Sequence, residues 1–254
     1  MPPEPDDSVK PAADAPARLP QHPLPPPDFT PPIAEYKREM ARLHGFQAYF
    51  WGVATFLEDH EEELVRCLQE RSDDPLEPED YDPEFHESLL NEWVLCRVVD
   101  NFEVYLTELL RFLLTYRPEM LSSSDEKVEL TFVVGNMDRL TEALADRKVR
   151  ELSYRSLASL SDYCQKNWAF PLLTGSYASD QAEEIVALRN LLVHARGVVN
   201  PYFLEQVGFS QYALGQRVEV SYELLTEAIS NINQLVEDID RRAAVKFWKP
   251  PLNG

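Results

Sequence analysis

The stretch that decides the fold is Leu89–Tyr116, LLNEWVLCRVVDNFEVYLTELLRFLLTY. Apolar side chains recur in it every three or four residues, as on a helix, and they cover most of the helix circumference. A helix that is apolar on more than one side must be covered by neighbours on more than one side. We therefore predict a helix from about Glu84 to Tyr116, closed by Pro118, at the centre of a helical bundle.

Helical periodicity continues on both sides of this segment. Upstream, aromatic and aliphatic residues at three- and four-residue spacing predict one long amphipathic helix from Ile33 to about Glu70. Downstream, the pattern fits helices over Glu126–Arg147, Ser153–Asn167, Asp180–Arg196 and Tyr222–Val245, with a short extended piece at Arg217–Ser221. The predicted fold class is all-α, an up-and-down multi-helix bundle with long N-terminal helices and at most one short β hairpin.

Composition divides the chain into three parts. The first 32 residues hold 12 of the 20 prolines, so residues 1–32 are expected to form a disordered tail. That tail is either simply solvated, which we favour, or a proline-rich ligand for another protein. A single helical domain is expected over 33–248, with an exposed acidic loop at Ser72–Pro83, followed by a flexible tail over 249–254.

The charge of the chain is strongly negative and unevenly placed. The net charge is −20, of which −18 falls in residues 1–137 and −2 in residues 138–254. This balance argues against a protein with a broadly basic surface that neutralises nucleic-acid phosphates. A polyanion would therefore have to approach the C-terminal half.

Several classes of protein and site are disfavoured. No apolar run is long enough for a membrane span, and the start MPPEPDDSVK lacks a secretory signal, so a cytoplasmic protein without a membrane partner is expected. Three widely spaced cysteines form no disulfide framework or metal pair. His60 and His86 lie among carboxylates that could ligate a metal, but a solvated surface explains them better. No cofactor is expected.

One segment concentrates polar groups that carry chemistry: EEIVALRNLLVHARGVVNPYFLEQ, Glu183–Gln206. Arg189, Asn190 and His194 stand among apolar residues that predict a core-facing stripe: Ile185, Leu188, Leu192 and Val193. Asn190 and His194 are four residues apart and share a helix face, and Arg189 is long enough to reach round. Gly197 looks like a helix stop, which places His194 in the last turn.

The string Arg189-Asn190-x3-His194, late in a helical bundle, resembles the Rx4–6H signature of the HEPN superfamily. The earlier segment VVDNFEVYLTELL, Val98–Leu110, is similar to the first long helix of larger HEPN groups. The resemblance covers residues 84–245. It implies a metal-independent endoribonuclease, often a toxin or an abortive-infection effector, that works as a homodimer. His194 is followed by Ala195-Arg196, so the H-x-Y motif of one HEPN branch is absent, and regulation by nucleotide transfer to that tyrosine is in doubt.

The residue types suit RNA cleavage, which needs deprotonation of a 2′-hydroxyl, charge stabilisation at phosphorus and protonation of the leaving 5′-oxygen. Histidine serves as a general acid or base near neutral pH, a role that falls to His194. Arg189 can hold the phosphate through paired charge-assisted hydrogen bonds. Asn190 can orient His194 or donate to a non-bridging oxygen.

Residues around the motif are assigned to substrate binding and assembly. Arg196 is either a phosphate contact or an ordinary exposed arginine at a helix end, and Asn200 and Tyr202 are expected to line the cleft of a homodimer built on the motif helix. The expected partners are a second copy, an RNA substrate and an inhibitory or triggering protein. The alternative is a non-catalytic HEPN-like interaction module, in which the Arg-Asn-His network only holds an interface together.

Overall fold

The computed structural model describes residues 28–71, 83–123, 132–133, 139–207 and 212–248. The long helices are α1 (Pro31–Glu58), α3 (Pro83–Tyr116), α7 (Ser176–Ala195) and α9 (Tyr222–Phe247). The shorter ones are α2 (Glu61–Gln69), η2 (Pro118–Ser123), α5 (Leu140–Leu152), α6 (Leu157–Trp168) and α8 (Pro201–Val207). Within these residues the extended structure is limited to one bridge, Val198 with Arg217, so the predicted all-α class is confirmed.

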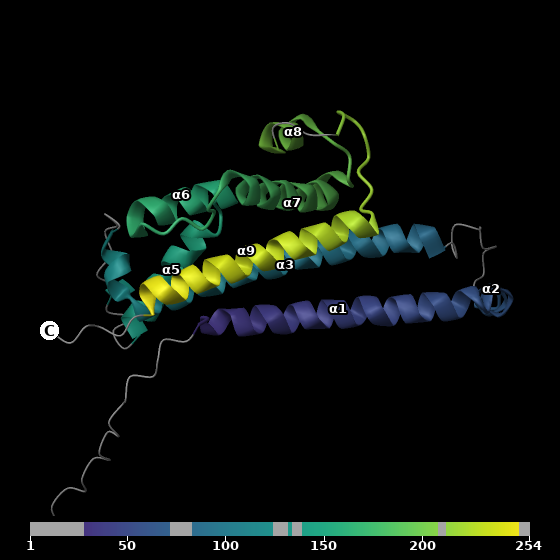
Figure 1. Cartoon of the computed structure of the whole chain (residues 1–254), viewed down its shortest axis with the longest axis horizontal. Helices are drawn as coiled ribbons and strands as arrows, with labels where there is room; N and C mark the ends of the chain where they lie inside the picture. The colour runs from purple at the N-terminus through teal and green to yellow at the C-terminus, as the bar shows by residue number, and fades with distance from the viewer. Residues whose placement is uncertain (1–27, 72–82, 124–131, 134–138, 208–211, 249–254) are drawn as a thin grey trace, which may run out of the picture.

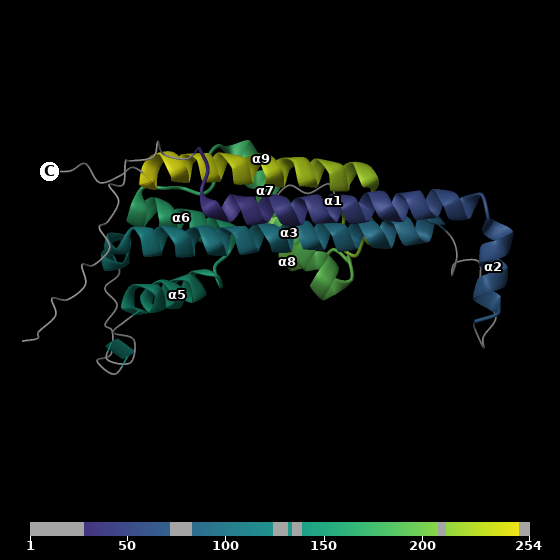
Figure 2. The same cartoon turned by 90° about the horizontal axis from the view of Figure 1, so that it is seen from below.

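Helix α3 is the central element, as its apolar circumference predicts. It packs against α1, α5, α7 and α9. Figures 1 and 2 show α3 and α9 as a middle layer, with α1 on one side and α7 and α8 on the other. Because neighbours cover α3 on several sides, many of its aliphatic and aromatic side chains are almost completely buried, among them Leu95, Val98, Val99, Phe102, Tyr105, Leu109, Leu113 and Leu114.

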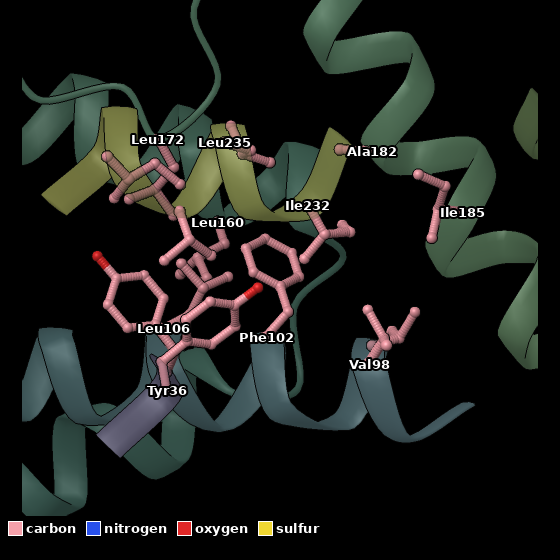
Figure 3. Packing of buried hydrophobic residues seen from close by; sticks show 14 of the residues in the cluster. Tyr36, Val98, Phe102, Leu106, Leu160, Leu172, Ala182, Ile185, Ile232 and Leu235 are labelled. Atoms are coloured by element: carbon pink, nitrogen blue, oxygen red, sulfur yellow. The ribbon is translucent and has the colours of Figure 1, made fainter. Parts of the chain in front are cut away.

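The core lies where these helices meet. In Figure 3, Phe102 and Leu106 of α3 face Ile232 and Leu235 of α9, while Tyr36 approaches from α1. The Tyr36 ring contacts that of Tyr105 at a centroid separation of 5.6 Å. Further core side chains come from α6, α7 and the segment between them, namely Leu160, Leu172, Ala182 and Ile185. None of the described helices is long and apolar enough to cross a membrane.

A buried carboxylate fastens the start of α1 to α9. Asp240 is fully buried and accepts hydrogen bonds from the Thr30 backbone N–H, at 2.7 Å, and from the Thr30 hydroxyl. The Tyr105 hydroxyl donates to the same carboxylate at 3.0 Å. Burial raises the pKa of Asp240, although these hydrogen bonds act in the opposite direction. Buried charges are tolerated only when they are paired or hydrogen-bonded in this way.

Two boundaries predicted near the N-terminus differ from the structure. The first helix starts at Pro31 rather than Ile33, and the expectation of a disordered tail falls mainly on residues 1–27, outside the described part. The single helix predicted to Glu70 is instead α1 and α2, separated at Asp59 and His60, with α2 turned away from the α1 axis (Figure 2). Like charges three and four residues apart destabilise a helix, and the acidic run 58–63 supplies them at the break.

Other predicted helices are present, but their first or last residues differ from the predicted ones. The predicted Glu84–Tyr116 helix is α3, and α9 runs two residues past the expected end. The α5 helix continues to Leu152, so Ser153 ends a helix instead of starting one, and Ser156 caps α6 through a hydrogen bond from the Ser159 N–H. The predicted start at Glu126 and the acidic loop predicted at Ser72–Pro83 lie outside the described residues, apart from Pro83, which begins α3 instead of ending the loop.

Candidate functional site

Helix α7 carries all three motif residues on the side of the molecule opposite α1 (Figure 1). Its core face differs from the predicted stripe, because Val193 is 55% exposed and Leu191 is buried in its place. Burial of Leu188, Leu191 and Leu192 leaves Arg189 and Asn190 at the edge of the core, where both are half-buried. The buried leucines therefore hold α7 against the core and thereby fix the backbone positions of Arg189 and Asn190.

Arg189 is held by three neighbouring groups. Its Nη1 donates to Asn190 Oδ1 at 2.9 Å, and its Nη2 forms an ion pair with Glu103 of α3. Asp100, one turn earlier on α3, lies 3.5 Å from the same Nη2. The Arg189 side chain is only 14% exposed, and its Nε is buried with no hydrogen-bond partner in the described part of the chain. The guanidinium is thus fixed between α3 and α7, with its charge balanced by two carboxylates.

Cys96 lies on α3 one turn before Asp100, and the charges of Asp100 and Arg189 both act on its thiol. Burial raises the pKa of this half-buried thiol, and the charge of Asp100 raises it further, whereas Arg189 lowers it. The arginine therefore does not turn Cys96 into a reactive thiolate, because the carboxylate and the loss of water outweigh it.

His194 lies in the last turn of α7, as the sequence predicts, and its side chain is exposed. Among the described residues it makes no hydrogen bond or ion pair, so its imidazole is accessible. Arg196 caps the C-terminal end of α7; it takes the left-handed conformation with φ 52° and is also exposed. Gly197 follows with φ 75°, so the predicted glycine stop comes one residue after the residue that ends the helix.

A strand-like segment after α8 supports the end of α7. The Val218 N–H donates to the Gly197 carbonyl at 2.9 Å, and the Val199 N–H donates to the Gln216 carbonyl at 2.8 Å. A Cβ at Gly197 would meet the Val218 carbonyl oxygen at 3.2 Å. This close approach, together with the positive φ, explains the glycine. The extended piece predicted at Arg217–Ser221 therefore supports the C-terminal end of α7 through the hydrogen bond from Val218 to Gly197.

Tyr202 belongs to the short helix α8, which the sequence did not predict, and Asn200 immediately precedes this helix. Asn200 Oδ1 accepts a hydrogen bond from the Phe203 N–H at 2.9 Å, and Pro201 opens the helix. This is helix capping, which gives Asn200 a structural role. Tyr202 is 65% exposed, and its hydroxyl accepts a hydrogen bond from Gln206 at 3.0 Å.

A groove of about 920 Å³ lies between α3, the turn from α5 to α6, α7 and α8. Asn190, Tyr202 and Gln206 line one wall of it. The charged residues around it are mainly acidic, with two arginines against four carboxylates: Arg97, Arg155, Asp100, Glu103, Glu108 and Glu183. Burial, followed by the charges of Asp180 and Asp162, raises the pKa of Glu183. The groove is therefore a poor place for a polyanion.

The structure brings together Arg189 and Asn190, and it places Asn190 and Tyr202 on one groove. His194, Arg196 and Asn200 do not line that groove. Sequence reasoning missed Asp100 and Glu103, the carboxylates that hold Arg189. Their signal was available, since they are two acidic residues three apart on a helix whose other faces are apolar.

Comparisons with known proteins give no further constraint on this site. No family model, no curated protein sequence and no solved structure shows a significant match to the chain.

Proposed function

We propose that the protein is a metal-independent endoribonuclease that cleaves RNA with Arg189, Asn190 and His194 in the cleft of a homodimer. One observation carries the proposal: the guanidinium of Arg189, held by Glu103 and Asn190, lies one turn before an accessible histidine on the same helix. This arrangement offers a fixed cation for a phosphate and a group that transfers protons.

The chain's own contacts leave room for the arginine to act on a phosphate. A guanidinium has five N–H donors, and the hydrogen bonds to Asn190 and Glu103 use one on each Nη. The second hydrogen on Nη1 remains for a non-bridging oxygen, whereas Nη2 is shared between Glu103 and Asp100. Glu103 then orients Arg189, while Asn190 connects the arginine to the helix face that it shares with His194.

The reaction needs a base for the 2′-hydroxyl and an acid for the leaving 5′-oxygen. One motif copy supplies a single histidine, so a two-fold pairing of α7 helices would supply both roles with two His194 residues. Val193, exposed between the motif residues, and the small, partly exposed Ala195 are compatible with such an approach. A cytoplasmic enzyme of this kind is a hazard to its own cell, which fits a toxin or phage-defence effector restrained by a partner.

A second candidate is a non-catalytic interaction module. The pairing of Arg189 with Glu103 and Asp100 favours it, because the two carboxylates neutralise the one motif cation. The excess of carboxylates around the neighbouring groove points the same way, since it weakens the attraction of RNA. In this reading the Arg189 network joins α3 to α7 and has no substrate.

The test is cleavage of end-labelled RNA by the purified full chain with a chelator present. The expected products carry a 2′,3′-cyclic phosphate and a 5′-hydroxyl. Arg189→Ala and His194→Ala should each reduce the rate by about 100-fold or more and abolish any toxicity on expression. His44→Ala is the matched control, because His44 is exposed on α1 and should leave the rate unchanged. A well-folded wild-type protein that neither cleaves RNA nor is toxic would support the interaction module instead.

A further inference from the structure

The C-terminal half of α1 presents an apolar stripe to solvent. Phe46, Tyr49, Val53 and Phe56 are 49%, 72%, 37% and 60% exposed. Their spacing of three, four and three residues places them on one face of the helix, as in the seam of a two-helix coiled coil. The N-terminal half of α1 is different, since Ile33 and Tyr36 are buried against the core. We call the four exposed residues the α1 seam.

Two glycines beside the seam have no explanation within one copy of the chain. Gly45 and Gly52 lie inside α1, and a Cβ added at either would meet no atom of the described residues within 4 Å. Glycine is the least favourable residue for a helix interior apart from proline. Seven residues separate the two, so they follow the same repeat as the seam and flank one edge of it. Small residues at that edge allow a second helix to approach closely.

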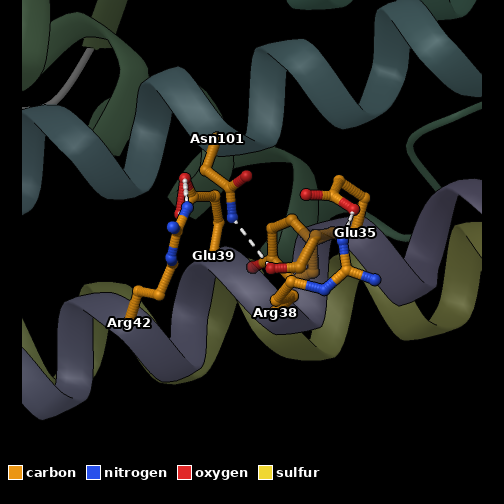
Figure 4. Close-up of polar contacts among 6 residues, drawn as sticks. Glu35, Arg38, Glu39, Arg42 and Asn101 are labelled. Carbon is orange, nitrogen blue, oxygen red and sulfur yellow. Dashed lines mark hydrogen bonds and ion pairs between the residues drawn. The ribbon is translucent and has the colours of Figure 1, made fainter.

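The charges at the two ends of the seam select one orientation for that helix. Arg38 and Arg42 are exposed before it, each paired within α1 to a neighbouring glutamate (Figure 4). Asp59, Glu62 and Glu63 are exposed after it. Because each arginine charge is already balanced by a glutamate, that end of α1 is nearly neutral, while the other end is acidic. A parallel second copy would place the two acidic ends together, whereas an antiparallel copy keeps them apart.

We propose that the α1 seam pairs with the α1 seam of a second copy of this chain, antiparallel and about a two-fold axis. In this pairing Phe46 opposes Phe56 of the second copy, and Tyr49 opposes Val53. The axis then passes beside Gly52, which brings the two Gly52 residues face to face. The same surface patch is used by both copies, as a two-fold interface requires.

This interface is separate from the candidate ribonuclease site. Figures 1 and 2 place α1 and α7 on opposite sides of the α3–α9 layer. The inference therefore does not rest on the proposed function, and the two can fail independently. A seam of four side chains is smaller than the ~800 Å² per partner of a typical stable interface, so we expect association in the micromolar range.

Sedimentation velocity over a series of concentrations tests the pairing. Tyr49→Glu/Val53→Glu places two like charges in the seam and should lower the weight-average mass at high concentration about twofold. Ala48→Glu/Thr55→Glu is the matched control, because it adds the same charge at two exposed positions of α1 away from the seam and should retain the wild-type mass. Circular dichroism checks that both variants stay helical. Equal masses for the two variants would overturn the proposal, whether or not the protein also pairs through α7.

Disulfide cross-linking tests the orientation. In a Cys67→Ser background, which removes an exposed thiol, Gly52→Cys should form a covalent dimer under mild oxidation. Thr55→Cys, exposed one turn along on another face, should form much less. Equal cross-linking at the two positions would overturn the antiparallel register. The proposal also requires that His194→Ala leave the cross-link unchanged, whatever its effect on RNA.

Discussion

Glu103 of α3 forms an ion pair with Arg189 of α7, 86 residues further along the chain. Asp100 approaches the same guanidinium to 3.5 Å, so one arginine bridges two turns of the central helix. This contact joins α7 to α3 at one point of the interface that the core packing sets. Beside it, Asn190 faces the groove, and His194 is exposed at the helix end.

The Glu103–Arg189 pair should contribute measurably to stability. Its arginine side chain is 14% exposed, so water screens it less than a surface pair. A double-mutant cycle with Glu103→Gln and Arg189→Ala, followed by urea unfolding, should give a coupling energy of about 1 kcal/mol. The Arg38–Glu35 pair, exposed on both sides, is the control and should give a value near zero. Equal coupling in the two pairs would contradict a partly buried bridge.

Asn200 should matter to α8 and not to a substrate. Asn200→Ala removes the acceptor for the Phe203 N–H and should lower the free energy of unfolding by about 1 kcal/mol. Asn200→Ser keeps a capping oxygen and should retain nearly all the stability. If the protein cleaves RNA, the serine variant should cleave at the wild-type rate. A large loss of rate with stability unchanged would return Asn200 to the substrate site.

The ionised Asp240 carboxylate should destabilise the fold at neutral pH, and this effect should decrease as the pH falls. Burial raises its folded-state pKa above the ordinary value of 3.8, so the folded protein binds its proton more readily than the unfolded chain does. The unfolding free energy of the wild type, measured relative to Asp240→Asn, should therefore increase as the pH falls through the folded pKa. Thermal unfolding of both proteins between neutral pH and about pH 4 checks the sign. A difference that shrinks on acidification would contradict it.

Gly197 should be intolerant of a side chain. Gly197→Ala combines a left-handed backbone with a Cβ only 3.2 Å from the Val218 carbonyl oxygen, and should cost about 1–2 kcal/mol. Gly45→Ala is the comparison, since its Cβ enters open space within a helix and should stabilise the protein by up to about 1 kcal/mol. Urea unfolding at low protein concentration measures both. An unchanged free energy of unfolding in Gly197→Ala would mean that the backbone at Val218 moves away easily.

The sequence was most informative where local pattern and burial agree. The apolar circumference of Leu89–Tyr116 predicted both the helix and its central place, and α3 has both. Helix boundaries were predicted less well at Asp59–His60 and at Ser153, where a break depends on charge repulsion or on the packing of the next helix. Helix α8 was missed because its seven residues are too few for a periodic signal.

The sequence by itself determined the all-α class, the central helix and the position of Arg189, Asn190 and His194 on one helix near its end. These follow from helical spacing, which is a property of neighbouring residues. Only the tertiary structure decided that Glu103 and Asp100 hold Arg189, that Asn200 caps α8, and that the α1 seam stays exposed. Each of these depends on which helices meet and at what rotation, and that is set by the packing of the whole core.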